Sequence, residues 1–145
     1  MILVDTFVAG RPRTKGSLAR RPNGSLYDSV VDSGKWRALM AGALRDAYEL
    51  AWVRIHGPTT DGPPPHPRAV EVSAAFYLPV APLDYGAGDL DKLVRNLLDA
   101  LGTRSRNPRY NGGVIIDDNQ VAVLQTAKTG PAAAPGVFVR VESLD

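Results

Sequence analysis

Four stretches of the chain have patterns of apolar residues that are typical of β-strands, either alternating with polar residues or nearly continuous. Ala69–Leu78 shows it most clearly, because valine, alanine, phenylalanine and leucine occupy every second position. Pro79 and Pro82 end this stretch. The other predicted strands are shorter or more continuously apolar, and they cover Ile2–Val8, Val121–Lys128 and Val137–Val141.

Two further stretches repeat apolar residues every three or four positions, which predicts amphipathic helices. The first begins after Asp32-Ser33, carries its apolar stripe from Trp36 to Ala51, and ends before Gly57. The second has Asp89 at the N-cap position and ends at Gly102. Its apolar face consists of Leu90, Leu93, Val94, Leu97 and Leu101.

The predicted elements follow the order β-α-β-α-β-β. This order predicts an α+β fold in a single domain, residues 1–145, with a single mixed β-sheet of about four strands and two main helices packed on it. Because the short connection Gly130–Gly136 joins the last two strands, we expect at least one strand pair of the sheet to be antiparallel. The segments without periodicity are predicted as loops: Gly10–Asn23, His56–Pro67 and Thr103–Gly113.

The composition is that of an ordinary globular domain, with 44% hydrophobic and 22% charged residues. No apolar run is long enough to span a membrane, so no membrane partner is expected. The N-terminus has an early Asp5 and no basic leader, unlike a signal peptide. The absence of cysteine excludes disulfides, thiol catalysis and cysteine-bound zinc, and it suits a reducing compartment such as the cytoplasm.

The net charge of +2 is a weak argument for nucleic-acid binding. The distribution of charge is more informative, because basic residues gather in two of the predicted loops, apart from the acidic centre of the chain. These residues are Arg11, Arg13, Lys15, Arg20 and Arg21 in the first loop and Arg104, Arg106 and Arg109 in the second. On charge alone, the two segments fit contacts with a phosphate backbone and fit solvated loops equally well.

Four aspartates form the candidate metal site. Asp89 and Asp91 stand at the start of the second helix, and Asp117 and Asp118 follow a short apolar run. Residues two apart on a helix point in nearly opposite directions, so Asp89 shares a ligand with Asp91 only if it bends back from the cap. If the fold brings these carboxylates together, they supply the hard oxygen ligands that Mg²⁺ or Mn²⁺ requires.

Each acid also has a purely structural interpretation. Asp89 suits an N-cap, and Asp91 suits a first helical turn or a surface ion pair with Arg95, four residues later. The segment Asp117–Asn119 suits a turn, because Asp and Asn favour turns.

The run Gly-Asp-Leu-Asp-Lys-Leu from Gly88, which continues to Leu-Asp-Ala-Leu, is followed by Ile-Asp-Asp-Asn-Gln-Val and then by Lys128. With the order of elements, and with Gly10-Arg11-Pro12 ahead of a Trp-bearing helix, this pattern resembles the RusA family of Holliday-junction resolvases. The resemblance implies a small homodimeric endonuclease of DNA recombination and repair, often carried by phages and prophages. Such an enzyme needs Mg²⁺ or Mn²⁺ and resolves four-way junctions and other branched DNA by paired symmetric nicks. Its expected location is the cytoplasm of a bacterium or a phage-infected host.

The resemblance also implies roles for individual acids. Asp89 and Asp91 take the places of the family's paired catalytic, metal-binding aspartates. Asp118 takes the place of the third essential acid, and Asp117 lies beside it as a possible addition to the site.

The basic residues match the family less closely. Arg95 stands where the family commonly has a catalytic lysine, and it keeps the charge but cannot act as a base. Lys92 is a candidate for the missing ammonium group. The expected DNA contacts are Arg11, Arg13, Lys15, Arg104, Arg106, Arg109 and Lys128.

Two other functions stay open at this point. One is a nuclease specific for flaps or replication forks, and the other is a non-catalytic phage DNA-binding protein in which the acids are caps and turns. A calcium-binding module fits poorly, since the segment after Asp89 lacks the oxygen-rich loop and late Glu of an EF-hand.

Overall fold

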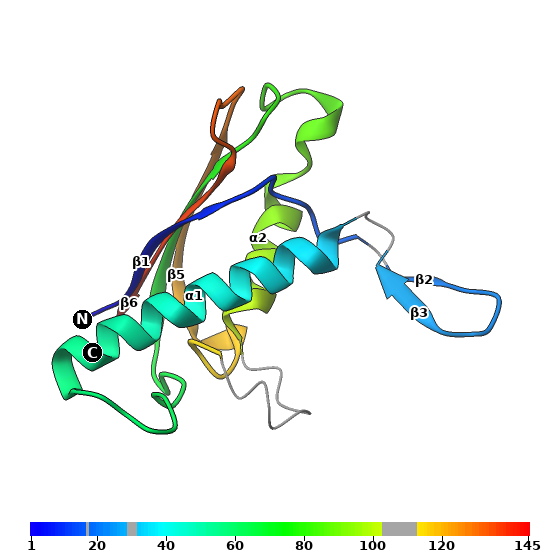
Figure 1. The fold of residues 1–145 in the computed structure, drawn as a ribbon. Helices are drawn as coiled ribbons and strands as arrows, with labels where there is room; N and C mark the ends of the chain where they lie inside the picture. The colour runs from blue at the N-terminus through cyan, green and yellow to red at the C-terminus, as the bar shows by residue number, and fades with distance from the viewer. Residues whose placement is uncertain (17, 29–31, 103–112) are drawn as a thin grey trace.

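The computed structural model describes residues 1–16, 18–28, 32–102 and 113–145 (Figure 1). The helices are α1 (Ser33–His56) and α2 (Leu90–Leu101), and the main sheet contains β1 (Ile2–Ala9), β4 (Val70–Tyr77), β5 (Val121–Thr129) and β6 (Gly136–Ser143). Shorter elements are the strands β2 (Leu18–Arg20) and β3 (Leu26–Asp28) and the 3₁₀ turns η1 (Tyr85–Ala87) and η3 (Asp118–Gln120). The predicted α+β fold, with one mixed four-stranded sheet and two main helices, is confirmed.

The strands of the main sheet lie in the order β1-β6-β4-β5. β6 pairs antiparallel with both β1 and β4, and β4 pairs parallel with β5. The expectation of at least one antiparallel pair is therefore confirmed. The two strands that the short connection joins are not neighbours, however, because β4 lies between them. The connection between them crosses the end of β4, where the backbone N–H of Ala132 donates to the carbonyl of Leu78 at 2.7 Å.

The inner position of β4 follows from its side chains. One face of β4 is buried along the whole strand, through Val70, Val72, Ala74 and Phe76. In β5, by contrast, the run from Ala122 to Gln125 is exposed. A strand of that kind is suited to the edge of a sheet, where only one side is paired.

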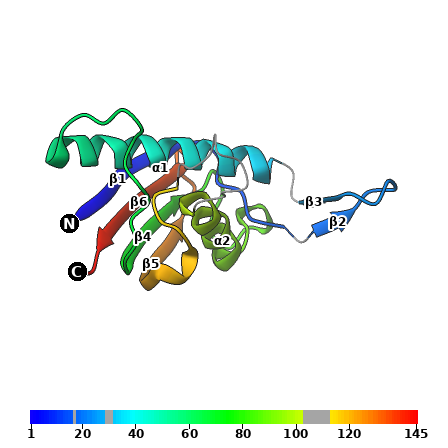
Figure 2. The ribbon, with the colours of Figure 1, turned by 90° about the horizontal axis from the view of Figure 1, so that it is seen from below.

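Both helices cover the same face of the sheet, as Figures 1 and 2 show from two directions. The buried side chains of β4 form one core with the apolar stripes of the helices. These stripes contribute Trp36, Met40, Leu44 and Tyr48 from α1 and Leu93, Val94, Leu97 and Leu101 from α2. The predicted helical periodicities are thus the packing faces of both helices.

The segment that the sequence predicts as a loop, Gly10–Asn23, contains the strand β2, and β3 follows directly after this segment. β2 and β3 pair antiparallel as a separate two-stranded hairpin. At its tip, the backbone N–H of Arg21 donates to the carbonyl of Ser25 at 2.8 Å. The hairpin extends away from the sheet and the helices in both views (Figures 1 and 2).

Candidate functional site

The start of α2 presents two acids without using either as a cap. Gly88, with a φ of 81°, turns the chain into the helix, a conformation that favours glycine. Asp89 is the N-cap residue, but its side chain makes no capping hydrogen bond and lies 3.6 Å from the ammonium of Lys92. Asp91 is exposed in the first turn, and it forms no ion pair with Arg95. Asp89 therefore lacks the side-chain hydrogen bond of an N-cap, and Asp91 lies in the first turn of the helix, as its structural interpretation expects, without the ion pair to Arg95.

In the second pair of acids, Asp117 has a capping role and Asp118 does not. Asp117 caps η3, because its Oδ1 accepts a hydrogen bond from Asn119 N at 2.9 Å. The side chain of Gln120 completes this capping box by accepting from Asp117 N at 2.9 Å. Asp118, the first residue of η3, takes no part in the capping box.

Asp118 faces α2 across an open groove, here called the Asp118 groove. It has a volume of about 590 Å³ and is lined by Leu90, Asp91, Val94, Arg95, Leu98, Asp118, Leu124 and Thr126. The fold therefore brings Asp91, Arg95 and Asp118 to one concavity, although they come from two elements that are separated in the sequence.

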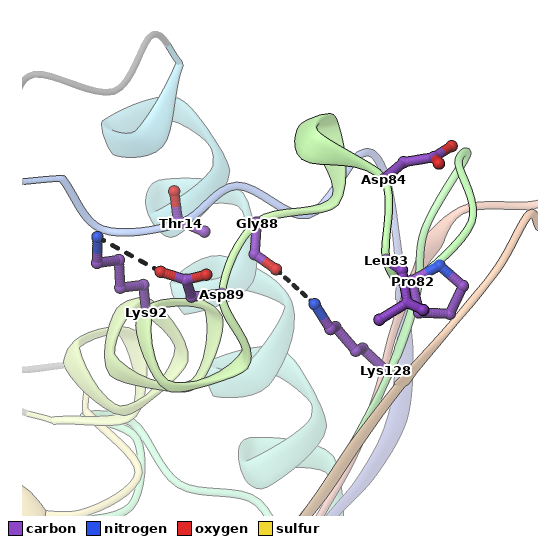
Figure 3. Close-up of a pocket in the computed structure, with 8 residues that line it drawn as sticks. All are labelled: Thr14, Pro82, Leu83, Asp84, Gly88, Asp89, Lys92 and Lys128. Carbon is purple, nitrogen blue, oxygen red and sulfur yellow. Dashed lines mark hydrogen bonds and ion pairs between the residues drawn. The ribbon is translucent and has the colours of Figure 1, made fainter.

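Asp89 lines a neighbouring groove, here called the Asp89 groove (Figure 3). Its volume is about 630 Å³, and its lining residues are Thr14, Pro82, Leu83, Asp84, Gly88, Asp89, Lys92 and Lys128. Figure 3 shows Thr14 beside Asp89 and Lys92, and it shows Lys128 reaching from β5 to the carbonyl of Gly88, a hydrogen bond of 2.8 Å. Lys128 thus supports the backbone that delivers Asp89.

The two grooves lie along one strand. Leu124, Thr126 and Lys128 alternate along the same face of β5; the first two line the Asp118 groove and the third lines the Asp89 groove. The three predicted metal ligands are therefore divided between adjoining grooves, two in one and one in the other. Within the part of the chain that the structure describes, no group of three or more His, Asp or Glu side chains lies close enough to hold one ion.

The Asp118 groove nevertheless suits Mg²⁺ chemically. This ion usually keeps several waters and takes only one or two protein carboxylates, with substrate phosphates supplying further oxygens. Asp91 and Asp118 provide two hard anionic donors on facing walls. The residues present therefore fit a hydrated Mg²⁺ or Mn²⁺ better than an ion that needs a full protein cage.

The electrostatics of the Asp117–Asp118 turn also favour a cation. The pKa of Asp118 is raised, first by its side-chain interaction with Asp117, then by partial desolvation and by the negative charges of Asp117 and Asp99. The pKa of Asp117 is lowered, chiefly by the hydrogen bond from the backbone of Asn119. A raised carboxyl pKa among like charges marks a point where a positive charge is stabilised.

The basic loop ahead of the hairpin is fastened to α2. The backbone N–H of Lys15 donates to the carbonyl of Lys92 at 3.1 Å, and the ammonium of Lys15 pairs with Asp99 at 2.5 Å. Lys15, predicted as a DNA contact, is thus an anchor of this loop. Arg11 is exposed and Arg13 is half-buried, while Arg104, Arg106 and Arg109 lie outside the described residues.

Asn96 connects α2 to α1 and to the basic loop, and the sequence pattern does not single it out. It is fully buried in α2, and its amide donates to the carbonyl of Arg13 at 3.0 Å and to the hydroxyl of Ser33 at 3.3 Å. Its side-chain oxygen accepts from Arg37 at 2.9 Å. The sequence offers one signal for the role of Asn96: it is a polar residue directly before Leu97, which lies on the apolar face of the helix.

The chain was compared with protein-family models and with curated proteins. No protein-family model matches the chain, and no curated protein matches it. Across residues 1–16, 18–28, 32–102 and 113–145, none of the helices combines the length and the apolar character that crossing a membrane demands.

Proposed function

We propose that this chain is a Mg²⁺- or Mn²⁺-dependent endodeoxyribonuclease that resolves four-way DNA junctions, as its resemblance to the RusA family implies. The observation that carries the proposal is the convergence of Asp91, Asp118 and Arg95 on one groove. Neither acid pairs with a cation among the described residues, and neither caps a helix. Two acids without a cation partner beside an arginine support a site that receives a metal ion and a phosphate.

In the proposed site, Asp91 and Asp118 hold the metal ion, and Asp89 in the adjoining groove is the third candidate ligand. When bound, the ion acts as a Lewis acid and lowers the pKa of a coordinated water. Arg95 donates hydrogen bonds to the phosphate oxygens on which negative charge develops during hydrolysis. Lys92 and Lys128 border the Asp89 groove, where they bind the phosphates next to the cleaved bond.

The proposed enzyme is a homodimer. A four-way junction has approximate two-fold symmetry, so two symmetric nicks require two equivalent sites related by a two-fold axis. The proposed setting is DNA recombination or repair in the cytoplasm of a bacterium or a phage-infected cell.

The first test replaces one ligand without changing its size. Asp91→Asn removes an anionic oxygen but keeps the shape, so we expect Mg²⁺-dependent nicking of a four-way junction to fall by at least about 100-fold. Binding of the junction in Ca²⁺ should persist, because a negative charge facing phosphate has gone. Asp61→Asn, an exposed acid on the proline-rich loop, is the matched control and should cut at the wild-type rate. Wild-type cutting by Asp91→Asn in single-turnover assays would show that the acids are structural.

The same assay separates metal binding from charge stabilisation. Arg95→Ala should leave the Mg²⁺ dependence nearly unchanged and slow cleavage by about 100- to 1000-fold, the usual cost of losing one donor to a transition-state oxyanion. Arg95→Lys should retain much of the activity, since the positive charge stays. If Arg95→Ala cuts normally, the metal site stands and the catalytic charge is to be sought at Lys92 or Lys128.

Two other candidate functions have distinct outcomes in this assay. A flap or fork nuclease cuts those substrates in preference to the four-way junction. A non-catalytic DNA-binding protein binds junctions but nicks neither a junction nor a linear duplex of the same sequence at any Mg²⁺ concentration.

A further inference from the structure

We infer that the β2–β3 hairpin is an arm that binds the phosphate backbone of a DNA duplex away from the cleaved bond; this inference rests on the proposed function. The hairpin forms its own two-stranded sheet and extends away from the body of the molecule (Figures 1 and 2). An isolated two-stranded hairpin is at best marginally stable in water, so one that extends from a fold is suited to contact a partner.

The tip of the hairpin has the chemistry of a phosphate ligand. Arg20 and Arg21 are adjacent and exposed where β2 ends, and they are followed by Pro22, Asn23, Gly24 and Ser25. Asn23 orders the turn by accepting hydrogen bonds from Ser25 N at 3.0 Å and Ser25 Oγ at 2.7 Å. The turn is therefore compact and polar, and it presents two guanidinium groups.

The same composition argues against a second copy of the chain as the partner. The core of a protein–protein interface is apolar and aromatic. Between Arg20 and Ser25 the hairpin offers arginine, proline, asparagine, glycine and serine, with no large apolar side chain. Anionic DNA is the occupant that complements this tip.

The base of the hairpin is held next to the proposed site. Thr14 lines the Asp89 groove, and Lys15 is fastened to α2 through Lys92 and Asp99. Asn96 holds the carbonyl of Arg13 from the core side. The hairpin therefore starts from a fixed point at the edge of the groove.

The chain length sets the reach of the arm. Four residues from Thr14 to Leu18 span at most about 14 Å, and the three-residue strand adds about 10 Å. Arg20 and Arg21 thus lie within roughly 25 Å of the Asp89 groove. At about 3.4 Å per base pair, this reach corresponds to no more than about seven base pairs along a duplex arm.

The test measures where the DNA backbone is protected. With wild-type protein bound in Ca²⁺, a hydroxyl-radical footprint on a four-way junction should include phosphates up to about seven base pairs from the branch. The double variant Arg20→Ala/Arg21→Ala should lose this outer protection while it keeps protection at the branch. Its affinity should fall about 10-fold, and the slope of log affinity against log salt should decrease by about 1.8, for two lost phosphate contacts.

The matched control removes the same charge elsewhere. Arg54 and Arg68 are exposed at positions outside both grooves, so Arg54→Ala/Arg68→Ala should keep the outer footprint and the wild-type salt slope. Circular dichroism checks that both double variants are folded.

Two outcomes contradict the proposed DNA-binding arm, and a third separates it from the proposed nuclease activity. If the hairpin variant keeps the outer footprint and the salt slope, the arm does not contact DNA, whether or not the protein cuts. If it instead shifts the monomer–dimer equilibrium in sedimentation at unchanged DNA affinity, the hairpin packs on a second copy. A hairpin-dependent footprint on a protein that never nicks DNA would support the arm and refute the nuclease.

Discussion

Neighbouring residues of identical chemistry have different roles in this molecule. Asp117 and Asp118 both follow Ile116 in one turn, and only the resemblance to the RusA family distinguishes them in the sequence. The structure separates them through Gln120, which closes a capping box on Asp117 and leaves Asp118 facing the groove. Likewise, an aspartate at position 89 suits both an N-cap and a metal ligand. The absence of a capping hydrogen bond from its side chain favours the metal ligand. Residue roles here depend on contacts that the sequence does not encode locally.

His66 gives a prediction at the same scale. Its ring Nε2 is buried without a partner among the described residues, and its carbonyl accepts from Gln120 at 2.8 Å. Desolvation is the largest cause that lowers the pKa of His66; Arg68 and the N-terminal charge act in the same direction, and Asp145 opposes them. The folded state therefore prefers the neutral ring.

Proton linkage gives the direction in which stability changes with pH. Below the ordinary pKa of histidine, the unfolded chain binds a proton that the folded chain resists, so the free energy of unfolding falls as the pH drops through the folded pKa. We expect urea denaturation to show that the wild type loses more stability than His66→Asn between about pH 7.5 and about pH 5, two conditions on either side of the ordinary histidine pKa of about 6.5. His56→Asn, an exposed ring stacked on Trp52, is the control and should follow the wild type. Equal pH dependence in all three proteins would contradict this role of His66.

At the scale of elements, strong periodicity predicts well and short elements are missed. α2 is predicted to its ends because its apolar residues repeat over three turns between Asp89 and Gly102. β2 and β3 have three residues each, too few for alternation to appear, and they lie in a segment that is rich in basic and turn-forming residues. Their pairing depends on the turn around Asn23-Gly24, which the loop prediction treats as irregular.

Asn96 links α2 to α1 and to the loop that contains Arg13, so we expect its removal to lower the stability of the fold strongly. Asn96→Leu keeps the branched shape of the side chain but removes its hydrogen bonds to Arg37, the Ser33 hydroxyl and the Arg13 carbonyl. Each lost hydrogen bond costs about 1 kcal/mol, and more where a charged group takes part, so we expect the free energy of unfolding to fall by about 2–4 kcal/mol. Gln125→Leu, an exposed amide on the opposite face of the sheet, should change it by no more than about 0.5 kcal/mol.

Chemical denaturation at neutral pH measures both variants. A loss for Asn96→Leu as small as that for Gln125→Leu would mean that the connections to the basic loop and to α1 contribute little to folding.

At the scale of the whole molecule, the sequence predicts the sheet but not its strand order. The short link between β5 and β6 favours a hairpin, yet β6 pairs with β1 and β4 instead. Strand order depends on which strands are buried on both sides and on the route of the crossover through α2. Neither quantity is visible in the spacing of a single stretch, so it cannot be predicted from local pattern.

The proposed paired nicking is also a property of the whole molecule. We expect the protein to sediment at twice the 15.5 kDa of the single chain and to convert a supercoiled plasmid with an extruded cruciform into linear DNA in one binding event. Mixing wild type with excess Asp91→Asn should yield nicked circles, because each mixed dimer has one working site. Linear product at an undiminished rate in the mixture would mean that each chain cuts independently.

The central place of β6 has a consequence for biosynthesis. β1 is made first and β6 last, yet β1 hydrogen-bonds only to β6 within the main sheet. On the ribosome, the first strand therefore waits for residues 136–143, and the sheet cannot grow from the N-terminus as the nascent chain emerges. Until then β1 and one edge of β4 lack the strand that pairs with their backbone N–H and C=O groups, and unpaired strand edges promote aggregation. In a chain that terminates before β6, these edges stay unpaired and the first strand never joins the main sheet.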